Sequence, residues 1–116
     1  MKYKKLNNLN DTYGLSHKAD IQLVPSQLIE TFGNPLTSDE YKVSGEYVFK
    51  NKKDNTVFTL YDWKYTSLYD SSGLTPDKFW KLEKPVWFNI GGKCYPGDFE
   101  TWIKKQIKKT INKRSN

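Results

Sequence analysis

The sequence is short of several residue types: its 116 residues include one cysteine, one histidine, one alanine and one arginine. A lone cysteine, Cys94, excludes an intramolecular disulfide, and a reduced setting is the default for such a chain. One cysteine and one histidine cannot supply the roughly four ligands of a structural zinc site. No apolar run approaches the length of a membrane span, and the first residues lack the apolar core of a signal peptide. We therefore expect a cytoplasmic protein with no bound metal, cofactor or membrane.

Positive charge is concentrated at one end of the chain. In residues 1–102, 13 lysines balance 13 acidic residues, whereas residues 103–116 contain six basic residues and no acid. A polyanion would be attracted to this basic end rather than to the neutral body. The basic residues are Lys104, Lys105, Lys108, Lys109, Lys113 and Arg114.

Aromatic residues are plentiful, with 4 Trp, 8 Tyr and 6 Phe, and they can build a core in a chain poor in aliphatic residues. Residues 43–63 predict a β-hairpin: two alternating runs rich in aromatic and β-branched residues flank a polar turn at 51–55. Shorter alternating runs predict strands at 19–24 and 85–90. Apolar spacing predicts helices at 25–32, opened by Pro25 and closed by Gly33, and from Asp98 to about 111.

These elements predict an α+β fold: a single two-layer domain of order β-α-β-β-β-α, with an antiparallel sheet and two helices on one face. We expect a polar, loosely packed N-terminal arm at 1–18, the domain at 19–112 and a basic tail at 113–116. The connection at 64–84 is long for a small domain, and such connections are often functional or disordered. Within it, Thr75, Pro76 and Asp77 can cap a short helical turn that carries Phe79 and Trp80.

Four short blocks carry a resemblance: Phe32-Gly-Asn-Pro35, the strand at 40–47, Thr59-Leu-Tyr-Asp-Trp-Lys64 and the stretch at 87–92. They resemble blocks in small uncharacterised proteins of phages and large DNA viruses, over roughly residues 20–110. Tyr47 stands where that group has tryptophan, and the connection at 64–84 is longer than theirs. The resemblance implies a virus- or mobile-element-encoded accessory protein with a role in host takeover or defence evasion, and it implies no catalytic residues.

The α-β-β-β-α order from residue 25 onward is also similar to that of double-stranded RNA-binding domains. Those domains place lysines where the last helix begins, so that charge and N–H groups meet phosphates. Here Asp98 and Glu100 occupy that position and would repel a phosphate.

Two side-chain pairs are candidates for chemistry, and each has a plainer interpretation. His17 and Cys94 can form a nucleophile–base pair only if the fold brings them together; a solvated histidine and a half-buried cysteine are favoured. Glu46 and Asp62 can face each other across the hairpin and act as paired carboxylates, but an exposed face with lysine partners is favoured. No nucleophile–base pair, metal-ligand set or cofactor fingerprint is recognisable, so we expect no enzyme activity.

The leading expectation is a small binding protein that contacts a host macromolecule, namely a protein, through exposed aromatic residues. A second is weak, sequence-independent nucleic-acid binding by the basic helix, and a third is capture of a small ligand such as a nucleotide under the 64–84 connection. The oligomeric state is left open. The expected aromatic surface comprises Tyr61, Trp63, Tyr65, Tyr69, Phe79, Trp80 and Trp87.

Overall fold

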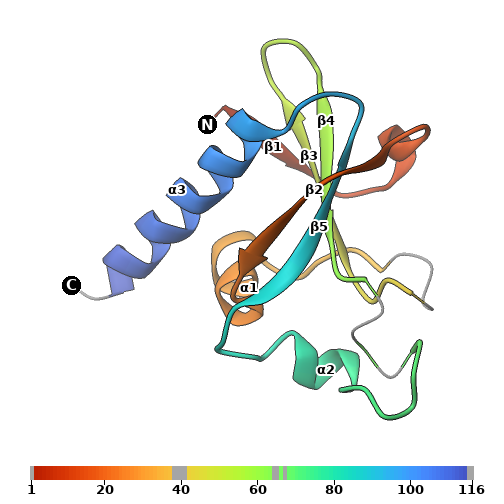
Figure 1. Cartoon of the computed structure of the whole chain (residues 1–116). Coiled ribbons are helices and arrows are strands. Elements are labelled where there is room, and N and C mark those ends of the chain that lie inside the picture. The colour runs from red at the N-terminus through yellow and green to blue at the C-terminus, as the bar shows by residue number, and fades with distance from the viewer. Residues whose placement is uncertain (1, 38–41, 64–65, 67, 115–116) are drawn as a thin grey trace.

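The computed structural model describes residues 2–37, 42–63, 66 and 68–114. Its elements follow one another along the chain as strands, helices and one 3-10 turn, η1 (Figure 1). They are β1 (Tyr3–Leu6), η1 (Asn10–Thr12), β2 (Ser16–Leu23), α1 (Pro25–Phe32), β3 (Glu46–Asn51), β4 (Val57–Tyr61), α2 (Pro76–Phe79), β5 (Val86–Gly92) and α3 (Gly97–Arg114).

The strands form one antiparallel five-stranded sheet in the order β1-β3-β4-β5-β2. Both longer helices, α1 and α3, lie on one side of this sheet and contact each other (Figure 1). The predicted α+β class, the order from β2 onward and the placement of the two helices are therefore confirmed. The prediction missed β1 and η1.

The N-terminal segment is not a loosely packed arm. Residues 3–6 form edge strand β1, which pairs with β3 from Tyr3↔Asn51 to Leu6↔Val48. Tyr3 is buried between Phe99 and Trp102, with ring centroids 5.3 and 5.0 Å away, and its hydroxyl donates to Asp98. A segment with so few apolar residues packs because one tyrosine buries a large area.

The helix-covered face of the sheet is an aromatic core. Strand residues such as Tyr47, Phe49 and Phe88 are fully buried there. On α3 the apolar stripe docks onto them, with Phe99, Trp102, Ile103 and Ile107 buried, as the spacing predicted. Asp98 does not cap α3, which begins one residue earlier; its carboxylate instead binds Lys2 and Tyr3.

A buried carboxylate fixes the two ends of the hairpin. Asp62 is fully buried, and its Oδ1 accepts hydrogen bonds from the backbone N–H groups of Ser44 (2.8 Å) and Gly45 (3.0 Å). The Ser44 hydroxyl donates to Asp62 Oδ2 and accepts from the Trp80 indole. Burial raises the pKa of the Asp62 carboxyl above its usual value, and these hydrogen bonds offset only part of that rise. Two of the blocks that carry the resemblance, 40–47 and 59–64, therefore meet at this carboxylate. The carboxylate pair expected between Asp62 and Glu46 does not form, because Glu46 lies opposite Tyr61 in the register.

The long connection before β5 is anchored at its C-terminal half. Thr75 caps α2 through its hydroxyl, and Pro76 takes the first helical position, as predicted. Phe79 and Trp80 then insert into the core, 1% and 9% exposed. These two rings belong to the core, and they anchor the end of the connection that leads into β5.

The second face of the sheet is covered only in part. Because β1 and β2 form opposite edges, the chain between them must cross the sheet, and η1 contacts β4 on the way. Figure 1 shows this crossing segment on the side of the sheet away from α3. It shields the region around Val48 and Thr59, which are 0% and 2% exposed. Beyond the crossing segment, Glu46, Tyr61 and Asn89 on this face are half-buried, and Trp63 and Trp87 are exposed; we call this region the open face.

Candidate functional site: the open face of the sheet

One cross-strand row defines the open face. The register pairs Glu46 with Tyr61, Tyr61 with Asn89 and Asn89 with Asp20, across β3, β4, β5 and β2. Directly paired residues of antiparallel strands project from the same side of the sheet, with their Cβ atoms about 5 Å apart. The open face therefore carries two carboxylates with a phenol and an amide between them.

A β-bulge brings the single histidine to the same place. His17 pairs with Gly91 and Ala19 with Ile90, so Lys18 is an extra residue in β2. In a regular strand, residues three apart point to opposite faces. The bulge reverses this alternation and puts His17 beside Asp20, with 2.7 Å between Nε2 and Oδ1.

These residues line a pocket of about 360 Å³ together with an aromatic wall. The wall is Tyr61 and Trp63, whose rings meet edge to face with centroids 6.4 Å apart. Trp63 is 42% exposed, and the Lys42 ammonium lies 5.7 Å from the ring centroid. Trp87, two residues before Asn89 on β5, is 52% exposed and extends the aromatic surface on the same face.

The electrostatics of the pocket are those of a site rich in acceptors. Burial raises the pKa of the Tyr61 hydroxyl, a hydrogen bond from Asn89 lowers it, and the charges of Glu46 and Asp20 raise it further. Both carboxylates thus act on the same phenol. The hydroxyl therefore stays protonated at neutral pH.

The structure divides the seven aromatic residues of the predicted surface into separate groups. Tyr61, Trp63 and Trp87 share the open face, whereas Tyr69 is exposed in the turn after Thr66. Phe79 and Trp80 are buried and cannot form an accessible surface; the prediction was wrong for them because they complete the core at Phe88, 5.9 and 5.7 Å away. Tyr65 lies outside the described residues.

The basic helix presents its lysines as predicted. Lys104, Lys105, Lys108 and Lys109 are exposed on α3, on the side away from the buried stripe. Further along, Lys113 is exposed too. Arg114 differs, because its guanidinium donates to Glu30 of α1 at 2.9 Å and its charge is partly neutralised.

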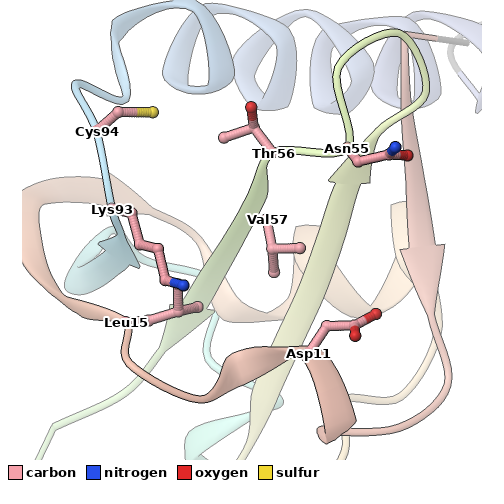
Figure 2. A pocket seen from close by; sticks show the side chains of 7 residues that line it. All are labelled: Asp11, Leu15, Asn55, Thr56, Val57, Lys93 and Cys94. Atoms are coloured by element: carbon pink, nitrogen blue, oxygen red, sulfur yellow. The ribbon is translucent and has the colours of Figure 1, made fainter.

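A second pocket of about 290 Å³ lies where the crossing segment meets the β3–β4 turn and the chain after β5. Figure 2 shows the Cys94 sulfur directed toward Thr56, and the Lys93 side chain directed toward Leu15. Cys94 is exposed rather than half-buried. It lines a different pocket from His17, so the structure does not bring the two together as a catalytic pair.

Sequence reasoning missed the polar half of the site. Asp20 and Asn89 alternate with apolar residues along their strands, which shows that they face away from the core but not that they meet. Asp20 and Asn89 lie side by side because β2 pairs with β5, and His17 joins them because of the bulge in β2. No residue pattern in the sequence marks either feature.

A scan against models of known protein families finds no match to this chain, and a search of curated proteins finds none either. Within the described residues, no three or more His, Cys, Asp or Glu side chains are grouped closely enough to hold a metal ion. None of the helices in the part of the chain described is long and apolar enough to cross a membrane.

Proposed function

We propose that this is a small, non-enzymatic binding protein whose site is the open face of the sheet, and that its ligand is another protein. The observation that carries the proposal is the position of Trp63 and Trp87, 42% and 52% exposed, on one face beside a pocket with convergent polar side chains. Tryptophan is enriched at the centres of protein interfaces, where burial of an indole supplies much of the binding energy. Two exposed indoles on one face form the kind of apolar patch that marks an interaction site.

The resemblance to phage and large-DNA-virus proteins supports a host protein as this partner. Such a protein acts in the host cytoplasm by covering a surface of its host partner, and it needs no catalytic activity for this. Its small size and its aromatic-rich face suit that mode of action.

The test is capture of a partner from host-cell lysate on the immobilised full chain, with and without nuclease. We expect one or more proteins to be retained after nuclease treatment, and the double variant Trp63→Ser/Trp87→Ser to lose them. Tyr95→Ser is the matched control, because Tyr95 is 85% exposed and lies outside the pocket residues. Equal retention by the double variant and the control would contradict the proposal.

A second candidate function, binding of nucleic acid, rests on the four exposed lysines of α3. Point charges without the planar fork of arginine attract phosphates but read no bases, so this binding is weak and independent of sequence. If four phosphates of duplex DNA are neutralised, log affinity falls against log salt with a slope of about −3.6.

Replacement of Lys104, Lys105, Lys108 and Lys109 by glutamine tests this second function. The fold should survive, because all four side chains are exposed and the stripe of α3 is untouched. We expect DNA affinity to drop and the salt slope to approach zero. Unchanged affinity and slope would show that α3 is not the contact.

A further inference from the structure

The pocket on the open face has the chemistry of a receptor for one cationic side chain. We propose that it accepts an arginine of the protein partner, with the guanidinium against the aromatic wall and its N–H groups directed to Asp20, Tyr61 and Asn89. This inference rests on the proposed function and names the residue that the partner contributes.

Charge complementarity is the first argument. Asp20 and Glu46 lie at the two ends of the cross-strand row, and each acts electrostatically on the Tyr61 hydroxyl between them. A phosphate or carboxylate ligand would meet two negative charges at this row. A cation is attracted to both.

Acceptor capacity is the second argument. An ionised carboxylate offers about four lone-pair sites on two oxygens, and His17 uses one of them on Oδ1 of Asp20. The Tyr61 oxygen and the Asn89 carbonyl supply further acceptors within the same pocket. A guanidinium has five donors in a rigid plane and no acceptor, which matches this set.

The aromatic wall distinguishes arginine from other cations. A flat guanidinium stacks on tryptophan and tyrosine rings while its edge keeps its hydrogen bonds, which an ammonium group cannot do. The Lys42 ammonium lies 5.7 Å from the Trp63 ring centroid, so a guanidinium that stacks there has to take its place. The pocket, at about 360 Å³, has room for one such side chain.

The experiment is an NMR titration of the ¹⁵N-labelled full chain with N-acetyl-arginine amide. Its matched probe is N-acetyl-citrulline amide, which has nearly the same shape without the charge. We expect the arginine probe to shift the Trp63 indole and Asn89 side-chain signals with saturation in the millimolar range, and citrulline to bind about tenfold more weakly because it lacks the charge-assisted hydrogen bonds. N-acetyl-lysine amide should bind more weakly than the arginine probe.

Asp20→Asn is the variant that tests the role of the carboxylate, and Asp77→Asn, an exposed acid on α2, is its control. We expect the first to weaken arginine binding about tenfold and the second to leave it unchanged. Similar shifts with arginine and citrulline, or equal titrations of the two variants, would overturn the inference.

The two proposals fail in distinguishable ways. Partner capture that needs Trp63 and Trp87 but is unaffected by Asp20→Asn leaves the proposed function standing and contradicts the arginine inference. Partner capture that the double variant Trp63→Ser/Trp87→Ser leaves unchanged contradicts the proposed function. In that case the probe titration still decides whether the pocket prefers arginine.

Discussion

Trp80 and Trp87 lie seven residues apart, yet one is 9% exposed and the other 52%. The Trp80 ring packs against Tyr47 and Phe88 on the helix-covered face, and its indole N–H is bound by Ser44. Trp87 precedes Phe88 directly and projects from the opposite face of β5. The same residue type therefore stabilises the fold on one face and remains available to a partner on the other.

This comparison predicts the largest stability effect at Trp80. Trp80→Ala should lower the free energy of unfolding by about 4 kcal/mol, because it removes a buried ring and leaves a cavity. Denaturant unfolding followed by circular dichroism measures the loss. A change within about 0.5 kcal/mol, as expected of surface positions, would mean that Trp80 is not part of the core.

The next largest effect is expected at the buried carboxylate. Asp62→Ala removes the acceptor of two backbone N–H groups and should destabilise the fold by about 3 kcal/mol. In a domain of this size the melting temperature then falls by roughly 10 °C. Asp70→Ala is the control, because Asp70 is exposed and its carboxylate accepts hydrogen bonds from Ser72 in its own turn. If the two variants melt together, Asp62 does not hold the hairpin ends.

Alkaline pH should destabilise the fold through the buried tyrosines of the helix-covered face. Burial and the hydrogen bond to Asp98 raise the pKa of Tyr3 to about 12, and burial also raises that of Tyr47. A folded pKa above the ordinary value of about 10 means that the native state holds protons that the unfolded chain releases. Stability is therefore unaffected below pH 10 and falls as the pH rises from 10 toward 12.

Tyr3→Phe separates this effect from general alkaline denaturation. The variant should be about 1 kcal/mol less stable at pH 7, because the hydrogen bond to Asp98 is lost, but should decline less steeply above pH 10. Tyr13→Phe, at a side chain that is 92% exposed, should follow the wild-type curve. Identical slopes for the wild type and Tyr3→Phe would contradict the assignment.

The smallest stability effect is expected at Trp87. Trp87→Ala should change the free energy of unfolding by less than about 0.5 kcal/mol, since the side chain is half exposed. Partner retention should nevertheless fall strongly, because indoles at an interface centre carry much of the binding energy. Destabilisation comparable to that of Trp80→Ala would remove the distinction between the two faces.

Local patterns were sufficient for most of the fold. Pro25 and Gly33 bound α1 as predicted, and the stripe of Phe99, Trp102 and Ile103 set the buried side of α3. The β1 strand was missed because Tyr3-Lys-Lys-Leu6 has no clear alternation and is fixed by a long-range contact between Tyr3 and α3. Periodicity reports which side of an element is apolar, and it does not report a partner about a hundred residues away.

The candidate site was predictable only in its aromatic half. Trp63 and Trp87 were expected at a surface, but so were Phe79 and Trp80, since composition cannot say which rings the core takes. His17, Asp20 and Asn89 are brought together by strand register and one bulge, which are properties of the folded sheet. Long-range pairing thus decides the polar chemistry of the site.

Site-specific photocrosslinking in host cells decides whether the open face is the surface that binds the partner. A benzophenone amino acid replaces Trp87 in one protein and Tyr95 in another, and adducts are compared after irradiation. We expect a discrete protein adduct from position 87 that is absent from position 95. No adduct from position 87, or the same adducts from both positions, would contradict it.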